Sequence, residues 1–424
     1  MQQFQSQFLQ QLQERGFISQ ITHTEELDKL MSEQKITAYI GFDCTAKSLH
    51  IGSLIQIMIL QTLQACGHQP IVLLGGGTTK VGDPSGKDEA RQFLDEQKIA
   101  ENLEGIINTL VKFDLSIKNP SLPAFKFVNN NNWLNDLKYI DFLRDFGRHF
   151  SINRMLTFDS VKSRLEREQP LSFLEFNYMI LQAYDFYELN KNQGCVLQIG
   201  GSDQWGNIVN GVELARRVAA VDHKTAAVFG LTTPLLTTSD GKKMGKTADG
   251  AVWLDEKMLS PFDYFQYFRN VDDTDVSKLL RFFTNLSLEK ITEIEQQEIN
   301  QQKEELAFQV TKLCHGEPDA NQARERARAI FSGNVDVKLL PEKSIQFSAE
   351  EIQNGKKLTE ILRETGLCES GGEAKRLIKG GGIKLDDTPV TDENLLIKFT
   401  PEQPFFKIAL GKKKFFKIAI KTNE

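Results

Sequence analysis

The sequence has few cysteines and no long apolar run, and both absences narrow its function. Its five cysteines are scattered, and no two of them stand at the CxxC spacing of a zinc site. They predict buried, reduced thiols and no protein-bound structural metal. No apolar stretch reaches the roughly 20 residues that a membrane helix needs. The first twenty residues are polar and predict an amphipathic helix instead of a signal peptide. We therefore expect a cytoplasmic protein that has no membrane partner.

The length and the charge distribution predict several domains with different partners. A chain of 424 residues is too long for one ordinary core, which predicts two or three domains. The formal net charge is −6, but residues 356–424 hold 14 Lys and Arg against 10 Asp and Glu, a net of +4, which leaves −10 for the rest. An acidic body followed by a basic tail indicates that the tail binds a polyanion.

Strand-like apolar runs alternate with helical segments over the first 230 residues. Strands are expected at 36–42, 70–76, 124–130 and 195–201, with helices at 53–66, at 88–111 and after the fourth strand to about 220. This alternation predicts an α/β fold with a Rossmann-like, doubly wound parallel sheet. Ligands of such sheets bind at the carboxyl ends of the strands. Those ends are rich in Gly and polar residues, in the segments GFDCT, GGGTTKVGDPSGK, VNNNN and IGGSDQWGN.

The same patterns predict the domain boundaries. Residues 1–230 are expected to form the Rossmann-like domain, with a helical insertion at about 133–188. The apolar and aromatic content of the insertion predicts a subunit interface, and the alternative is simply more core. Residues 231–335 are expected to hold a basic loop and an α-helical domain, 336–355 a linker, and 356–424 a small α+β domain.

The segment 39–53 places a histidine where a strand gives way to a helix. A helix that begins near His50 offers free backbone N–H groups and the positive end of its dipole, which suits a phosphate. Gly52 allows a ligand to approach the backbone closely. Taken alone, the pattern fits a helix cap or a surface histidine equally well.

A second segment, residues 239–247 (SDGKKMGKT), sets paired lysines in a glycine-containing loop. It departs from a Walker A loop because position 240 is Asp where that pattern needs Gly. Residues 82–87 (GDPSGK) depart as well, with three intervening residues instead of four. Both departures argue against a P-loop NTPase. The lysines can still neutralise a leaving pyrophosphate, and the alternative is a solvated basic turn.

A third pattern is a polar stripe on an apolar helix. Tyr178, Gln182 and Asp185 fall at positions i, i+4 and i+7, so they share one face among apolar neighbours. Polar groups in such surroundings need partners, because burial without them is costly. The stripe therefore predicts either pairing with other protein groups or a pocket for a polar ligand.

Together these segments carry a family resemblance. Residues 50–53 (HIGS) resemble the HIGH motif of class I aminoacyl-tRNA synthetases, with Ser53 in place of the last His, and residues 243–247 (KMGKT) resemble their KMSKS loop. The segments YxGFD at 39–43, GDPSGK at 82–87, YxxxQxxD at 178–185 and GGSDQWGN at 200–207 resemble bacterial tyrosyl-tRNA synthetases. With the tail, the resemblance covers essentially the whole chain.

The resemblance implies an enzyme that activates tyrosine with ATP, releases pyrophosphate and transfers the tyrosyl group to the terminal adenosine of tRNA(Tyr). The implied tyrosine site consists of Tyr39, Asp83, Tyr178, Gln182, Asp185 and Gln204. The implied ATP site consists of Gly41, Asp43, His50, Gly52, Ser53, Gly201, Asp203, Lys243, Met244, Lys246 and Thr247. The implied catalytic residues are Thr45, His50, Lys87, Arg91, Lys243 and Lys246. Mg²⁺ is implied as the companion of ATP, and the family implies a homodimer.

Within the implied tyrosine site, Tyr178, Gln182 and Asp83 would hold the ammonium group. Asp185 would accept a hydrogen bond from the phenol, with Tyr39 as its partner. The substrate carboxylate is already a nucleophile at neutral pH, so the reaction needs no general base. Catalysis is then positioning and stabilisation of charge on the phosphates.

The basic tail predicts an RNA-binding module. Residues 356–397 predict a helix, a break at Ser370, a short basic helix with Lys375, Arg376 and Lys379, a glycine turn and a strand. Paired cations before a tight turn suit the phosphates of folded RNA. The segment resembles the alpha-L RNA-binding motif shared with a ribosomal small-subunit protein. The alternative is a small solvated α+β module.

Two other interpretations stay open. A tryptophanyl-tRNA synthetase would share both nucleotide motifs but would be expected to lack the tail and the pairing of Tyr39 with Asp185. An RNA-binding scaffold that has kept an inactive synthetase body is indicated only by Ser53. Exchange of ATP with pyrophosphate that depends on tyrosine, on tryptophan or on no amino acid separates the three.

Overall fold

The computed structural model describes residues 3–85, 94–221, 223, 226–239, 241, 244–247, 250–332, 340, 342–401, 404–411 and 414–422. Side chains are described for all of these except residues 159, 160, 246, 247, 330–332, 414 and 422. The chain forms two units, Met1–Ala320 and Asn321–Glu424. In the described ranges no helix is both long enough and apolar enough to cross a bilayer. All five cysteines are buried and unpaired, as predicted.

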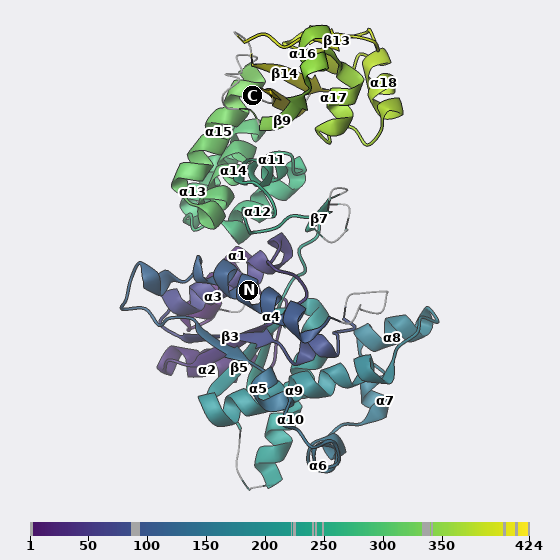
Figure 1. The fold of residues 1–424 in the computed structure, drawn as a ribbon. Helices are drawn as coiled ribbons and strands as arrows, with labels where there is room; N and C mark the ends of the chain where they lie inside the picture. The colour runs from purple at the N-terminus through teal and green to yellow at the C-terminus, as the bar shows by residue number, and fades with distance from the viewer. Residues whose placement is uncertain are drawn as a thin grey trace. The chain divides into compact units, whose positions relative to one another are not determined.

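A six-stranded sheet lies at the centre of the first unit (Figure 1). In spatial order its strands are β1 (Gln20–Ile21), β6 (Phe229–Thr233), β5 (Cys195–Gly201), β2 (Thr37–Asp43), β3 (Gln69–Gly75) and β4 (Lys126–Asn129). All neighbours are parallel except β1, which is antiparallel to β6. The predicted parallel sheet is therefore confirmed. The sequence analysis did not predict β1 and β6, because two and five residues are too short for a periodic signal.

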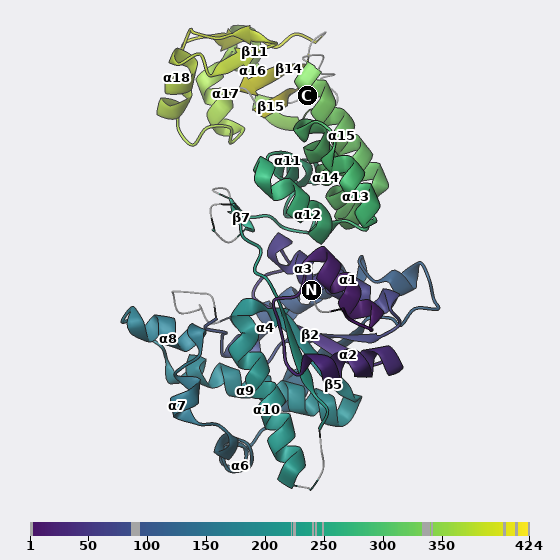
Figure 2. The same cartoon turned by 180° about the vertical axis from the view of Figure 1, so that it is seen from behind.

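Helices cover both faces of this sheet (Figures 1 and 2). The helix α3 (Leu54–Ala65) packs against β2 and β3, whereas α9 (Phe173–Gln193) packs against β5, and α10 (Trp205–Val221) against β5 and β6. The crossover from β2 to β3 and the crossover from β5 to β6 run in opposite directions across the sheet. Since such crossovers are right-handed, they place their helices on opposite faces. The direction reverses between β2 and β5, so their carboxyl ends form the switch point where ligands bind.

The helix α9 carries three predicted site residues, and its own sequence defines both of its ends. The Ser172 side chain accepts a hydrogen bond from the N–H of Glu175, whose carboxylate accepts one from the Ser172 N–H, which is a capping box. Gly194 ends the helix in the left-handed region, at φ 61°. The predicted insertion 133–188 therefore ends inside a helix of the main domain. The predicted end of the insertion at about residue 188 was misplaced because the apolar pattern of α9 continues unchanged across that position.

The remaining helices of the first unit lie before, between and after these elements. They are α1 (Gln7–Arg15), α2 (Thr24–Glu33), α4 (Glu96–Val111), α5 (Asn131–Leu134), α6 (Tyr139–Asp145), α7 (Ile152–Met155), α8 (Asp159–Glu166), α11 (Pro261–Arg269), α12 (Val276–Phe283), α13 (Leu288–Glu295) and α14 (Ile299–His315). A short hairpin of β7 (Lys246–Thr247) and β8 (Gly250–Ala251) precedes α11. The helical insertion and the helical segment at 261–332 are thus as predicted, and α15 (Glu317–Ser332) crosses into the second unit.

The second unit is a small α+β domain. Its five-stranded sheet has the order β12 (Thr388–Pro389), β11 (Ile383–Leu385), β14 (Phe405–Leu410), β15 (Lys414–Thr422) and β9 (Glu342–Phe347). A smaller pair consists of β10 (Lys356–Lys357) and β13 (Leu396–Ile397), and the helices are α16 (Ala349–Asn354), α17 (Leu358–Glu364) and α18 (Gly371–Lys379).

The predicted linker 336–355 is wrong over residues 342–354. These residues form β9, which pairs in parallel with β15, and α16. The side chains of Ile345 and Phe347 are buried in the core of this unit. The sequence analysis missed β9 because its partner strand lies about 75 residues further along the chain, as the pairing of Glu342 with Lys417 shows.

Candidate active site

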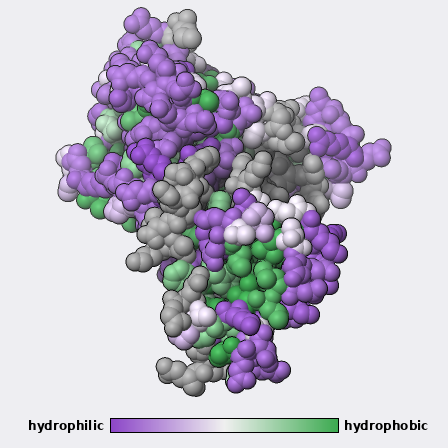
Figure 3. Space-filling model, turned by 90° about the horizontal axis from the view of Figure 1, so that it is seen from above, coloured by the Kyte–Doolittle hydropathy of each residue, from purple (hydrophilic) through white to green (hydrophobic). Residues whose placement is uncertain are grey.

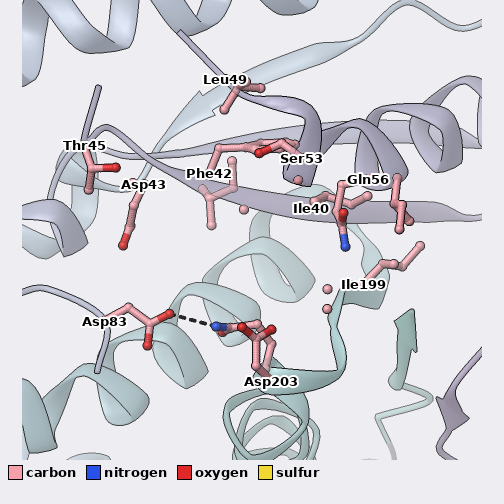
Figure 4. Close-up of a pocket in the computed structure, with 18 of the residues that line it drawn as sticks. Ile40, Phe42, Asp43, Thr45, Leu49, Ser53, Gln56, Asp83, Ile199 and Asp203 are labelled. Carbon is pink, nitrogen blue, oxygen red and sulfur yellow. Dashed lines mark hydrogen bonds between the residues drawn. The ribbon is translucent and has the colours of Figure 1, made fainter. Parts of the chain in front are cut away.

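A cavity of about 640 Å³ opens at the carboxyl ends of β2 and β5. This volume lies in the range of small-molecule sites. Fifteen of the residues predicted for the tyrosine, ATP and catalytic sites line it: Tyr39, Gly41, Asp43, Thr45, His50, Gly52, Ser53, Asp83, Tyr178, Gln182, Asp185, Gly201, Asp203, Gln204 and Met244. Figure 4 shows Asp83 and Asp203 on the side of the cavity opposite Leu49 and Ser53.

Five predicted residues are not described at their side chains. Lys87, Arg91 and Lys243 lie outside the described residues, and for Lys246 and Thr247 only the backbone is described, as strand β7. Met244, which follows Lys243 directly, is described and buried, and its N–H donates to the carbonyl of Leu236 at 2.8 Å.

The inner end of the cavity holds a buried phenol and a buried carboxylate. Tyr39 and Asp185 are each 1% exposed. The Asp185 carboxylate accepts hydrogen bonds from Asn130 Nδ2 at 2.9 Å and from Trp133 Nε1 at 2.8 Å. Burial raises the pKa of Asp185 to about 7 and raises the pKa of Tyr39 well above its ordinary value, an effect to which the nearby Asp185 charge adds.

Among the residues that the structure describes, the Tyr39 hydroxyl has no hydrogen-bond partner. A buried hydroxyl without a partner costs about 1–3 kcal/mol, so the free protein carries an unsatisfied group at the wall of its own cavity. Gln198, on the neighbouring strand β5, likewise leaves its Oε1 without a partner and lines the same cavity. These orphaned polar atoms indicate that a ligand with its own donor and acceptor completes the site.

A hydrogen-bonded network supports this end of the cavity. Asn130 receives the N–H of Gly77 at 2.8 Å on its Oδ1 and donates to Thr78 Oγ1 at 3.0 Å, and Thr78 donates in turn to Asp43 Oδ1 at 2.9 Å. The sequence analysis did not assign Thr78, Asn130 or Trp133 to the site. The signal was present only in part, as the polar segment VNNNN at the end of β4.

Carboxylates dominate the middle of the cavity. Asp83 is buried and accepts from Gln204 Nε2 at 2.7 Å and from the N–H of Ser85 at 2.9 Å, and Figure 4 shows the bond to Gln204. Tyr178 donates its hydroxyl to Asp43 Oδ2 at 3.1 Å. Burial first, and then the charge of Asp43, raise the pKa of Asp83 to about 6. Two carboxylates this close together favour a cationic group of a ligand.

His50 caps the short helical turn that precedes α3. Its Nδ1 accepts the N–H of Gly52 at 3.0 Å, so the ring folds back over the start of the helix. A Cβ atom on Gly52 would lie 2.6 Å from His50 Cε1, which explains the glycine. His50 is therefore a helix cap, as one interpretation of the sequence had it, and it also lines the cavity. Ser53 stands at the N-cap of α3, and its side chain makes no capping hydrogen bond.

The lysine-bearing segment meets the His50 turn at Gly245. Gly245 has φ 126°, a conformation that disfavours any residue with a Cβ, and a Cβ there would lie 3.4 Å from His50 Nδ1. The backbone of Val252 joins both parts, because its N–H donates to Gly245 and its carbonyl accepts from Ile51. The two nucleotide motifs found in the sequence are therefore neighbours in space.

In the second unit, α18 displays the predicted basic residues. Ser370 caps this helix by accepting the N–H of Glu373, and the side chains of Lys375 and Arg376 are exposed. Lys379 is exposed and pairs with Glu393 at 3.2 Å. Among the described residues of the whole chain, no group of three or more His, Cys, Asp and Glu side chains is arranged to hold a metal ion.

Comparisons with known proteins agree with this geometry. The family model described as tRNA synthetases class I (W and Y) matches residues 31–332, and the S4 domain model matches residues 356–400. A tyrosine–tRNA ligase of Wolbachia sp. subsp. Brugia malayi is 53% identical over 98% of this chain and 99% of its own. One of Xanthobacter autotrophicus is 53% identical over 97% of this chain and 98% of its own.

A solved structure agrees with the fold of the first unit. The C-terminally truncated mitochondrial tyrosyl-tRNA synthetase of Aspergillus nidulans is 31% identical, with a TM-score of 0.68 over 76% of this chain and 94% of its own. A tryptophanyl-tRNA synthetase of Encephalitozoon cuniculi bound to tryptophan shares the fold at 11% identity and a TM-score of 0.53.

Proposed function

Because the chain belongs to the class I tRNA synthetases of the tryptophan and tyrosine family, we propose that it is a tyrosine–tRNA ligase. It activates tyrosine with ATP to give tyrosyl-adenylate and pyrophosphate. It then transfers the tyrosyl group to a ribose hydroxyl of the terminal adenosine of tRNA(Tyr). The sequence identity to tyrosine–tRNA ligases over nearly the full chain supports this proposal.

The observation that carries the choice of tyrosine is the unpartnered Tyr39 hydroxyl beside Asp185. A substrate phenol that enters this end of the cavity can donate to the Asp185 carboxylate and accept from Tyr39, which satisfies both groups. Phenylalanine would bury the Tyr39 hydroxyl without a partner and would leave the carboxylate one donor short. The loss of a hydrogen bond to a charged group and a buried orphan cost about 1–3 kcal/mol each, so the site favours a phenol.

Asp83 supplies the charge that holds the substrate ammonium, with Tyr178 and Gln182 beside it. Gln182 is oriented by Asn207, whose Nδ2 donates to Gln182 Oε1 at 3.0 Å and to Gln204 Oε1 at 3.0 Å. The substrate carboxylate then points away from the phenol end and attacks the α-phosphorus of ATP. No protein base is needed, because that carboxylate is ionised at neutral pH.

The nucleotide lies along the switch point in this proposal. Gly41, Asp43, Gly52, Ser53, Gly201, Asp203 and Met244 contact the adenosine, while Thr45 and His50 stand on the phosphate side. Lys87, Arg91, Lys243, Lys246 and Thr247 surround the leaving pyrophosphate, where cations stabilise the charge that develops on it. Mg²⁺ fits as a companion of the ATP phosphates, which supply oxygen ligands that the protein need not provide.

The exposed apolar side chains of the insertion support a homodimer. Seven of the twelve large hydrophobic side chains that are exposed among the described residues lie in α6–α9 or the loops between them: Tyr139, Ile140, Ile152, Leu156, Leu165, Phe173 and Leu174. Figure 3 shows a hydrophobic area bordered by hydrophilic residues on the face seen from above. A second copy of the chain would cover these side chains. Sedimentation velocity at micromolar concentration tests this, and a monomer there would contradict it.

The second unit would bind the tRNA through Lys375, Arg376 and Lys379. Lys375 and Arg376 lie on the exposed face of α18, whose last turn holds Arg376 and Lys379. Point charges on a helix bind RNA phosphates by shape without reading bases. The bacterial relatives support a cytoplasmic location for the enzyme.

Pyrophosphate exchange into ATP tests the proposed function. The purified full chain is incubated with labelled pyrophosphate and ATP, and with tyrosine, tryptophan, phenylalanine or no amino acid. We expect exchange with tyrosine alone. Exchange with tryptophan would assign the chain to the other branch of the family, and no exchange with any amino acid would support an RNA-binding scaffold.

A further inference from the structure

The N-terminal end of α12 holds the chain just before the lysine segment. The Asp275 carboxylate accepts the backbone N–H of Ser239 on Oδ2 at 3.1 Å. Lys278, one turn further along, donates its ammonium group to the carbonyl of Thr237 at 2.7 Å. Asp275 Oδ1 and Lys278 Nζ lie 3.0 Å apart, so the two side chains also pair with each other. The pair thus binds the backbone N–H of Ser239 and the backbone carbonyl of Thr237.

Both bonds involve ionised groups and one is well shielded from water. Asp275 is 3% exposed, while the Lys278 side chain is 35% exposed. Hydrogen bonds to charged groups are roughly twice as strong as neutral ones. A buried carboxylate that binds a backbone N–H and an ammonium group therefore restrains the position of Ser239 along the chain. Ser239 precedes Lys243 by four residues and Lys246 by seven.

The opposite end of α12 is anchored to the body of the first unit. Arg15, at the end of α1, donates to the carbonyls of Arg281 at 2.9 Å, Thr284 at 2.8 Å and Leu286 at 2.6 Å. Arg281 lies in the last turn of α12, Thr284 is its C-cap and Leu286 follows shortly after, so Arg15 binds the C-terminal end of the helix, where a cation is favourable. Phe17 stacks on Phe282 with ring centroids 5.1 Å apart. The C-terminal end of α12 is therefore held in place by α1 and the residues that follow α1.

The lysine segment is also held at Met244 and Gly245. The N–H of Met244 donates to the carbonyl of Leu236, and Gly245 lies close to the ring of His50. The N–H of Met244 thus meets the carbonyl of Leu236, and α12 holds the backbone at Thr237 and Ser239. Each of these hydrogen bonds acts on a backbone atom of residues 236–245.

We propose that Asp275 and Lys278 are positioning residues that set the approach of the lysine segment to ATP. They act on the formation of the adenylate and leave the binding of tyrosine unchanged. This inference rests on the proposed function, because it assigns the lysine segment to the ATP phosphates. Neither residue is among those that line the cavity, so we assign both to positioning and not to substrate contact.

Four variants of the full chain test the proposal. Asp275→Ala removes both the acceptor and the charge, Asp275→Asn keeps an acceptor for Ser239, and Lys278→Met removes the donor but keeps most of the aliphatic stem. Asp273→Asn is the control. It removes one carboxylate two residues earlier in the same turn, where Asp273 is exposed and pairs with Lys303.

For each variant we measure the Kd of tyrosine by equilibrium dialysis, the KM of ATP and the kcat of pyrophosphate exchange, and the thermal midpoint. Loss of one charge-assisted hydrogen bond predicts a fall of about tenfold in kcat/KM for ATP with Asp275→Ala. Asp275→Asn should fall between Asp275→Ala and the wild type, and Asp273→Asn should match the wild type. The Kd of tyrosine should stay within about twofold, since one hydrogen bond elsewhere in the fold does not reach that site.

Two outcomes would overturn the proposal. One is an unchanged kcat/KM for ATP in both Asp275→Ala and Lys278→Met. The other is a fall in ATP turnover that is matched by an equal loss of tyrosine affinity, which would mean that the pair only stabilises the fold. The Asp275→Asn and Lys278→Met variants decide the matter if Asp275→Ala does not fold. A wild-type protein without tyrosine-dependent exchange would refute the proposed function itself, whatever the variants do.

Discussion

Replacing Tyr39 by Phe should weaken tyrosine binding and at the same time stabilise the free enzyme. The two effects have opposite signs because the Tyr39 hydroxyl is buried and has no partner in the described part of the chain. In the proposed complex this hydroxyl donates to the substrate phenol, which itself donates to Asp185. Removing that bond costs a net of about 0.5–1.5 kcal/mol, or roughly a 2- to 12-fold increase in the Kd of tyrosine.

In the free enzyme the same substitution removes an unsatisfied polar group. Relief of that burial contributes up to about 1–3 kcal/mol, and the phenyl ring keeps its contact with Phe186, whose ring centroid lies 5.5 Å away. We therefore expect the free energy of unfolding of tyrosine-free protein to stay the same or to rise. Most Tyr to Phe changes at hydrogen-bonded sites would lower it instead.

The assay combines equilibrium dialysis with labelled tyrosine and calorimetry of the protein without ligands. Because a chain of two units need not unfold in one step, the relevant transition is the one that added tyrosine shifts upward. Asp185→Ala is the comparison, since loss of a charged acceptor predicts a larger increase in Kd, about 10- to 150-fold. An unchanged Kd in Tyr39→Phe, or a lower midpoint of that transition, would refute the reasoning.

Three further predictions concern the rest of the site. Lys243→Ala combined with Lys246→Ala should slow adenylate formation in single-turnover quench-flow while the Kd of tyrosine stays nearly the same; a collapse of tyrosine binding would make these lysines structural. Since Asp83 has its pKa raised to about 6 and must be ionised to hold the ammonium group, the Kd of tyrosine should rise as the pH falls through 6, by about tenfold per unit below it; a Kd that is flat from pH 7 to pH 5 would contradict this. Truncation after Ser332, which removes β9 together with its partner β15, should spare pyrophosphate exchange but abolish charging of tRNA; retained charging would exclude the RNA-binding role of the second unit.

Local patterns in the sequence were enough to predict the elements that build the cavity. The shared face of Tyr178, Gln182 and Asp185 follows from the helical repeat, and α9 places all three on the cavity. The polar ends of the predicted strands lie at the switch point because parallel strands bring their carboxyl ends to one edge. Gly52 was predicted to let a ligand approach the backbone closely, whereas in the structure the group that a Cβ there would meet is the ring of His50.

Longer-range partners could not be predicted in the same way. Asn130 and Trp133 bind Asp185 across 55 and 52 residues of chain, and no period or spacing in the sequence relates them. The same holds for β9, whose short alternating pattern looked like a linker until its pairing with β15 was known.

The sequence by itself determined the main strands and helices around the cavity, both ends of α9, and which strands carry polar residues to one edge of the sheet. Periodicity, capping residues and glycines encode these features within a few residues of chain. Only the tertiary structure decided that the Tyr39 hydroxyl is left without a partner while Asp185 has two, and that Asp275 holds the backbone at Ser239. Hydrogen bonds of this kind depend on the distance between atoms that the chain itself does not bring together, so they exist only once the packing of the whole unit is complete.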